Sequence, residues 1–361
     1  MPIYCRSICR TDALTNKLPT LTIAHIILAE GVIVSTMKFK NSKSSINRRQ
    51  FHGIATSLAL LGSTTVHAQD AVSEFAPVYQ PGTVRHYKIG LTLRAPNAYC
   101  ANVYFTANVP ANWPKEQTVK VANEQLTRHV TQYKYRDGLH GLKQMLVFIP
   151  QVPAGQTAMA HVTFEIMKNN VQQPANVAGL TITTTLPRTV RYFLGVSPLI
   201  ESRNAVILKK ANEITQDATS AWNRVELVHD WIRENIMYQN GNRHSALKTL
   251  QAGFGEKESL TSLFIAMCRN LKIPARTVWV PDHNYAEFYL QAPDGTGHWF
   301  PCELSGRRSF GELADNKPML LRGDNFRVPE KQTPQRYVAE HLKASGGAKP
   351  QVQFVREYTQ I

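Results

Sequence analysis

The sequence predicts an α+β protein in which an all-β domain precedes a domain that mixes helices and strands. Between about residues 83 and 185, apolar and polar residues alternate in short runs separated by Pro, Asn and Gly, which is the pattern of half-buried strands. Beyond residue 204, apolar residues recur every three or four positions, as on helix faces that pack against a core. We therefore expect the following parts: an upstream extension and export signal over 1–68, a β-sandwich over 69–187, the mixed domain over 188–330 and a C-terminal extension over 331–361.

The leader has the features of an export signal. Residues 37–68 begin with several basic residues, continue with a moderately apolar stretch and end in a small-residue cleavage pattern at Ala68. The pair Arg48-Arg49 precedes Phe51 at the spacing of a twin-arginine signal. We therefore expect Met37 to be the true start and the protein to be exported, to the periplasm or the extracellular space, by the twin-arginine route.

Charge and cysteines limit the classes of partner and cofactor. The formal net charge is +15, and more than a third of this excess lies in the leader or before it. No block of Lys and Arg is interleaved with aromatic residues, so nucleic acid is not an expected partner, and no stable membrane span is expected after signal removal. After the leader only Cys100, Cys268 and Cys302 remain, and their number and spacing argue against a disulfide framework and a metal site. We expect no cofactor.

The expected β-domain rests on alternating apolar residues in several short segments. These residues are Ile89, Leu91, Leu93, then Val103 and Phe105, then Val162, Phe164 and Ile166. Short strands at such spacing, without a long helical pattern, favour a sandwich. We expect this domain to act as a scaffold or partner-binding module without chemistry of its own.

Helices are expected after a linker over Pro187–Ser202. The first covers Asn204–Thr215. The second is capped by Thr219 or Ser220, and its apolar face consists of Val225, Val228, Ile232 and Ile236.

Residues 255–303 contain one more helix and three strands. From Glu258 the apolar residues follow helical spacing, and Pro274 cannot continue that helix. Strands are expected over 277–280, 286–290 and 299–303, the last two antiparallel because Asp294-Gly295 favours a tight turn. The apolar face of the helix consists of Leu260, Leu263, Phe264, Met267 and Leu271.

Four segments in this region, GEKESLT, KIPAR, HNYAE and WFPCE, resemble the motifs of the transglutaminase-like superfamily, a branch of the papain-like folds. The resemblance implies a papain-like α+β core. It also implies a site in which a Cys at a helix N-terminus is the nucleophile, a His at the start of a strand is the base, and an Asp on the next strand orients that His. By position these places hold Lys257, His283 and Glu303.

Only the His of this set is kept. Glu303 can still accept a hydrogen bond from an imidazole, but Lys257 is cationic at neutral pH and cannot form a thioester. The resemblance therefore implies a pseudoenzyme: a catalytically silent cysteine protease-like domain that keeps a cleft for a peptide or protein ligand, possibly one of the cell envelope.

Several alternatives stay open at this stage. Lys257 could be a solvated surface lysine or could pair with Glu303. Cys302 is adjacent to Glu303 and could serve with His283 in an active peptidase, amidase or transglutaminase, although neighbours on a strand point to opposite faces unless a bulge intervenes. Cys268 is expected in the core. A third class is a structural envelope protein that works through its β-domain alone.

Overall fold

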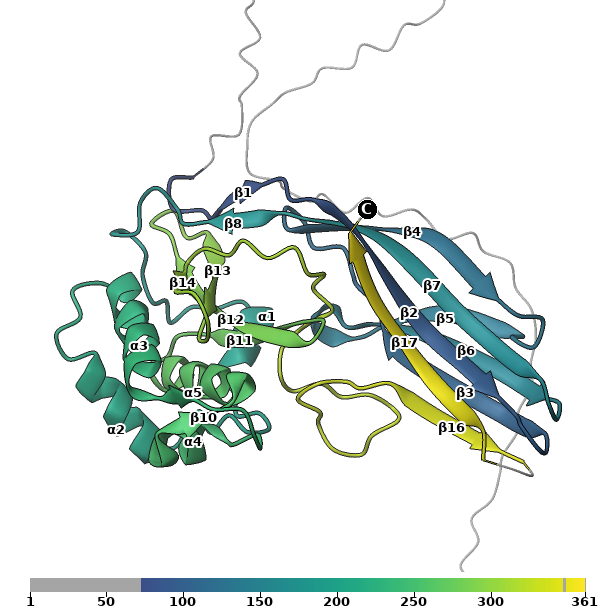
Figure 1. Ribbon diagram of the computed structural model, residues 1–361. Helices are drawn as coiled ribbons and strands as arrows, with labels where there is room; N and C mark the ends of the chain where they lie inside the picture. Colours follow the sequence, from purple (N-terminus) through teal and green to yellow (C-terminus); the bar gives the residue numbers. More distant parts are fainter. Residues whose placement is uncertain (1–72, 347–348, 361) are drawn as a thin grey trace, which may run out of the picture. The chain divides into compact units, whose positions relative to one another are not determined.

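The computed structural model describes residues 73–346 and 349–360. The strands in which apolar and polar residues alternate form two four-stranded antiparallel sheets (Figure 1). Their strand orders are β16-β3-β6-β5 and β17-β2-β7-β4. The strands are β2 (Val84–Arg94), β3 (Cys100–Asn108), β4 (Gln117–Leu126), β5 (Gln132–Asp137), β6 (Lys143–Val152), β7 (Thr157–Lys168), β16 (His341–Ser345) and β17 (Gln351–Gln360). A short 3-10 helix, η1 (Leu139–Gly141), precedes β6, and β1 (Val78–Gln80) pairs separately with β8 (Asn170–Gln172).

The two sheets share one hydrophobic core, as the alternation predicts. Ile89, Leu91 and Leu93 on β2 are all buried, as are Val103 and Phe105 on β3. They belong to the same cluster as the apolar residues of β7, because residues two apart on a strand share a face. This cluster extends to residues beyond the sandwich: Trp279, Leu320, Leu321, Phe326, Val328 and Val338.

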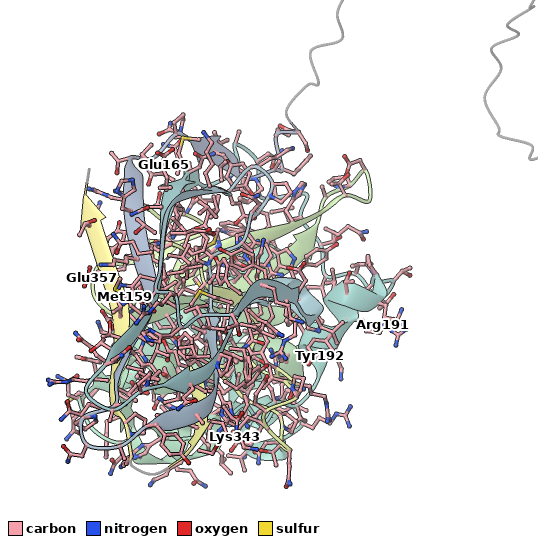
Figure 2. All side chains as sticks on the ribbon, turned by 90° about the vertical axis from the view of Figure 1, so that its right-hand side faces the viewer. Met159, Glu165, Arg191, Tyr192, Lys343 and Glu357 are labelled. Carbon is pink, nitrogen blue, oxygen red and sulfur yellow. The ribbon has the colours of Figure 1, made fainter. Side chains whose placement is uncertain are left out.

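Residues 331–361, which we expected as a C-terminal extension, contribute an edge strand to each sheet. β17 pairs with β2 in one continuous antiparallel register, and β16 pairs with β3. Lys88 and Glu357, directly opposite in the β17–β2 register, form an ion pair of 3.7 Å; Glu357 is labelled in Figure 2. The sandwich is therefore completed by β16 and β17.

Deleting residues 351–361 is expected to lower the melting temperature and to promote self-association. The deletion leaves β2 with unpaired backbone groups at a sheet edge, which is a template for pairing with another chain. Thermal unfolding and size-exclusion chromatography measure the two effects. Val352→Thr, on the same strand, is the control and should stay within about 0.5 kcal/mol of the native stability. A deletion variant that melts and elutes like the native protein would contradict the role given to β17.

A separate five-stranded sheet has the order β14-β13-β12-β11-β15, and α5 packs against β11 and β12 (Figure 1). The strands are β11 (Ala275–Val280), β12 (His283–Gln291), β13 (Gly297–Glu303), β14 (Ser309–Phe310) and β15 (Leu321–Arg322). The helices are α1 (Arg188–Arg191), η2 (Tyr192–Leu194), α2 (Ala205–Ile214), α3 (Ala221–Asn235), α4 (Ala246–Ala252) and α5 (Lys257–Asn270). The two-residue strands β9 (Met237–Tyr238) and β10 (Phe254–Gly255) pair in parallel.

The expected helices are confirmed with small changes at their ends. Asn204 caps α2 by accepting hydrogen bonds from the backbone of Val206 and Ile207, and Ser220 caps α3. The predicted apolar face of α3 is buried in one cluster with α5 and β12. One expectation is wrong: the stretch 187–202 is not a plain linker, since it contains α1 and η2.

The described residues all belong to one compact unit, Ala68–Ile361. The expected export signal and Met37 lie outside the described residues. Within the described part of the chain, none of the helices combines the length and the apolar character needed to cross a membrane.

Candidate functional site

The N-terminus of α5 carries Lys257 as its first residue. Glu256 caps the helix, and its carboxylate accepts a hydrogen bond of 3.1 Å from the backbone N–H of Ser259. Gly255 permits the close approach into this turn, since a Cβ there would lie 2.8 Å from the Cβ of Ser259. The Lys257 side chain is exposed, and it forms no ion pair within residues 73–346 and 349–360. The pair with Glu303 that we considered is thus not formed.

His283 and Glu303 meet at the ends of two neighbouring strands. His283 is the first residue of β12 and Glu303 the last of β13. The antiparallel register pairs Ala286 with Cys302, which places Glu303 diagonally across from His283 on the same face of the sheet. His283 Nε2 lies 2.6 Å from Glu303 Oε2, with side chains 16% and 14% exposed. The two side chains form a hydrogen-bonded dyad.

The other ring nitrogen of His283 has no partner. A carboxylate only accepts hydrogen bonds, so Nε2 is the donor in the dyad and, in a neutral ring, Nδ1 is an acceptor. Nδ1 is buried, and no described residue bonds to it. The dyad therefore offers a free acceptor nitrogen, which is what a general base needs to take a proton from a nucleophile.

Cys302 and Cys268 lie in the core. Cys302 is completely buried, as is Cys268, and both belong to the cluster beneath the sheet. Burial raises the pKa of both thiols, and it raises that of Cys302 well above its ordinary value. No hydrogen bond joins Cys302 to His283 among the described residues. Strand alternation accounts for this, because the neighbouring Glu303 points towards His283.

We expect the thiols of Cys268 and Cys302 to resist alkylation in the folded protein. Each is inaccessible and its thiolate is disfavoured by burial. The measurement is iodoacetamide labelling of the native and the urea-unfolded protein, mapped by peptide mass spectrometry. Lys257→Cys should add one site that reacts in the native state. Rapid native labelling of Cys302 would contradict the burial described here.

Two side chains of α3, His229 and Arg233, contact the backbone carbonyl of Glu303. His229 Nε2 lies 2.9 Å from the Glu303 carbonyl oxygen, and Arg233 donates to the same oxygen at 3.2 Å. The sequence analysis missed both residues. The available signal was a histidine beside Val228 in a helix whose predicted face is apolar.

Exposed apolar side chains lie beside the start of α5. Met237 is 64% exposed and Tyr238 is 44% exposed, both on β9. The parallel register places Tyr238 against Gly255, two residues before Lys257. An apolar surface therefore borders the N-terminus of α5.

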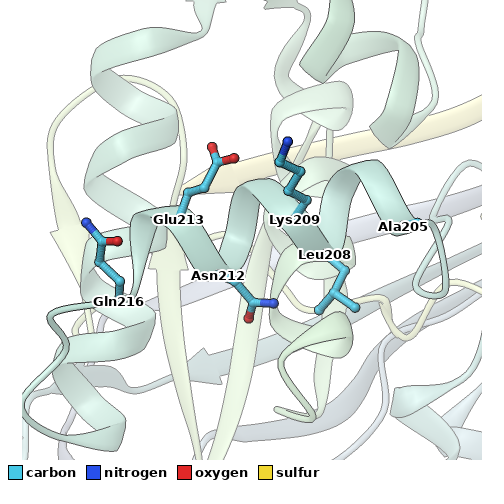
Figure 3. A pocket seen from close by; sticks show the side chains of 6 residues that line it. All are labelled: Ala205, Leu208, Lys209, Asn212, Glu213 and Gln216. Atoms are coloured by element: carbon cyan, nitrogen blue, oxygen red, sulfur yellow. The ribbon is translucent and has the colours of Figure 1, made fainter.

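Two hollows in the surface lie elsewhere. One of ≈ 500 Å³ runs along α2 and is lined by Leu208, Lys209 and Glu213 among others (Figure 3). The other, ≈ 380 Å³, lies between residues 178–182 and the start of α3. Neither includes Lys257, His283 or Glu303. Within the described residues, no group of His, Cys, Asp and Glu is arranged to hold a metal ion.

Comparison with known proteins identifies the domain that carries these residues. Residues 209–304 match the model of the transglutaminase-like superfamily. This segment is a transglutaminase-like superfamily domain. Lys257, His283 and Glu303 all lie inside it. No curated protein matches the chain.

One solved structure shares the fold of this chain. A candidate cysteine protease from Cytophaga hutchinsonii superposes with a TM-score of 0.50 at 18% identity, covering 79% of this chain and 94% of that one. A candidate protease from Parabacteroides distasonis gives a TM-score of 0.27 at 12% identity, covering 61% and 43%, and supports no conclusion. The predicted α+β class with a papain-like transglutaminase core is confirmed.

Proposed function

We propose that this chain is an exported protein whose transglutaminase-like domain is catalytically silent and binds a peptide or protein, such as one of the cell envelope. Three parts of this proposal can fail separately: export, the loss of catalysis and the retained binding. No cofactor is part of it.

One observation carries the loss of catalysis. Lys257 stands at the first position of α5, where the resemblance places the nucleophile, while the His283–Glu303 hydrogen bond of 2.6 Å is present. A thiol at a helix N-terminus is activated by the unpaired N–H groups and the helix dipole. An ammonium group at the same place gains nothing from them and cannot carry an acyl group as a thioester.

Retained binding is supported by the surface beside the N-terminus of α5. Met237 and Tyr238 expose apolar area next to the start of α5, and Tyr is among the side chains that contribute most to protein interfaces. Together they offer an apolar anchor to an extended peptide.

The alternative enzyme, which would use Cys302 with His283, has little support. Its thiol is completely buried, and burial raises the pKa well above the ordinary value. The register shows no bulge between Ala286 and Gln291 that would turn Cys302 towards His283.

Binding is tested with the full chain by biolayer interferometry against three immobilised probes: muropeptides, unfolded casein and a soluble polysaccharide. We expect binding to a peptide-containing probe. Tyr238→Ala should raise the Kd at least about tenfold, which is about 1.4 kcal/mol. Leu208→Ala is the matched control on the α2 hollow, since Leu208 is also an exposed apolar residue.

Two outcomes would overturn retained binding at this site. One is the absence of binding to all three probes. The other is binding that Leu208→Ala weakens and Tyr238→Ala does not. Binding that Tyr238→Ala and Leu208→Ala both leave unchanged would instead favour the purely structural class, in which the sandwich alone meets the partner.

A further inference from the structure

His229 is a histidine in an apolar core. It lies on α3, fully buried, with its ring 5.1 Å from that of Phe310 and 6.3 Å from that of Phe264. Nevertheless both ring nitrogens have partners. Nδ1 lies 2.8 Å from Asp230 Oδ1, and Nε2 lies 2.9 Å from the carbonyl oxygen of Glu303.

Both of these partners are hydrogen-bond acceptors. A backbone carbonyl has no proton to donate. Asp230 is held ionised by Arg308, which donates to Oδ1 at 2.9 Å and to Oδ2 at 2.8 Å, and this bidentate pair contributes to a lowered pKa of Asp230. A neutral imidazole has one N–H, so it would leave a lone pair facing an oxygen at one of the two contacts.

We propose that His229 is a positioning residue, held as an imidazolium between Asp230 and the Glu303 carbonyl, and that it sets the direction in which the Glu303 side chain meets His283. The proposal depends on the dyad described above and not on any ligand of the domain.

The surroundings of His229 shift its pKa in opposite directions. Burial lowers the pKa of His229 by more than its hydrogen bonds to Asp230 and Glu303 raise it, so the net direction is downward. The charged groups that face it are Asp230 and Arg233 on α3 and, beyond Asp230, Arg308. The rings that α5 and β14 pack against it are uncharged. We nevertheless place the second proton on the ring because both nitrogens lie within 3 Å of hydrogen-bond acceptors, one of them a carboxylate held by Arg308.

The segment after β13 is clamped to α3 by the same group of residues. Arg233 donates to the carbonyl oxygen of Gly306 at 2.7 Å as well as to that of Glu303. Arg308 reaches Asp230 and Glu226. Glu303 is thus fixed through its backbone by α3 while its carboxylate holds His283. Loss of the Nε2 proton from His229 would remove one of these anchors.

The test is side-chain NMR on the full chain labelled with 15N-histidine. For His229 we expect two protonated ring nitrogens at pH 7.5. A single N–H in the native protein would overturn the proposal. This measurement uses no ligand and no turnover, so it can fail while the proposed function stands, and the reverse also holds.

Variants separate positioning from stability. In His229→Phe the hydrogen-bonded Nε2 proton of His283 should shift or disappear, because the Glu303 carbonyl loses one of its two hydrogen bonds to α3. In His161→Gln, which alters another buried histidine, on β7, that resonance should be unchanged. An unchanged His283 signal in folded His229→Phe would contradict positioning. If His229→Phe does not fold, the proton count in the native protein decides.

Discussion

Replacing Lys257 with Cys is expected to give the protein amide-cleaving or amide-transferring activity that the native chain lacks. The new thiol would stand at the N-terminus of α5, where the thiolate is favoured, and His283 Nδ1 is free to act as base. The thiolate would attack an amide carbonyl, the C–N bond would break with proton transfer to the leaving amine, and water or a second amine would release the acyl group. Ammonia release and incorporation of a labelled amine, on a broad panel of glutamine-containing peptides, measure both outcomes.

The rate of turnover expected for Lys257→Cys depends on His283 acting as the general base. Positioned general bases contribute about 10²–10⁴-fold, so adding His283→Ala to Lys257→Cys should slow turnover at least about 100-fold. Lys257→Ala removes the charge without supplying a thiol and should be silent. A folded Lys257→Cys protein with a reactive thiol and no turnover would show that His283 does not serve position 257.

Asp324→Ala is expected to destabilise the protein by about 3–5 kcal/mol, the cost of leaving a buried charge without its partner. Asp324 and Arg269 are 1% and 2% exposed, and their side chains meet through two hydrogen bonds of 2.9 and 2.8 Å. Ser197 donates to the same carboxylate at 2.6 Å. Urea unfolding measures the loss. Asp217→Ala, at an exposed position, is the control and should stay within about 0.5 kcal/mol of the native value.

The pH dependence of stability follows from the same pair. Burial raises the pKa of Asp324, but the charge of Arg269 and the hydrogen bond from Ser197 outweigh it and hold the pKa below its ordinary value. A carboxyl group whose pKa is lower in the folded state stabilises fully above its unfolded pKa, and this contribution disappears as the pH falls through the folded pKa. Native stability should therefore fall on acidification below about pH 4, and Asp324→Asn should flatten this part of the profile. Equal profiles would contradict the pairing.

Local patterns were enough to predict most of the fold. Helix α5 and strands β11 to β13 follow from the spacing of Leu260, Leu263 and Phe264, the break at Pro274 and the turn at Asp294-Gly295. Alternation in the first half predicted β2, β3 and β7. These signals act between residues close in sequence, which is why they can be read without the structure.

Contacts between distant residues could not be predicted in this way. The pairing of β16 and β17 with β3 and β2 joins residues more than 200 positions apart, and no local pattern specifies a partner. The short helices α1 and η2, inside the expected linker, were missed because they are too short for apolar periodicity to show.

The candidate site shows the same limit. Motif resemblance and strand alternation placed His283 and Glu303 together and turned Cys302 away. The His229 and Arg233 contacts with Glu303 depend on how α3 packs against the end of β13, and helix periodicity alone does not report that arrangement.

The most direct test of the central claim is amide turnover by the native protein measured beside Cys302→Ser, with ammonia release from the same peptide panel as the readout. A silent native protein and a silent variant are the predicted result, because Lys257 stands in the nucleophile's place and Cys302 is buried. Turnover by the native protein that disappears in Cys302→Ser would contradict the account and make this chain an enzyme with a relocated thiol.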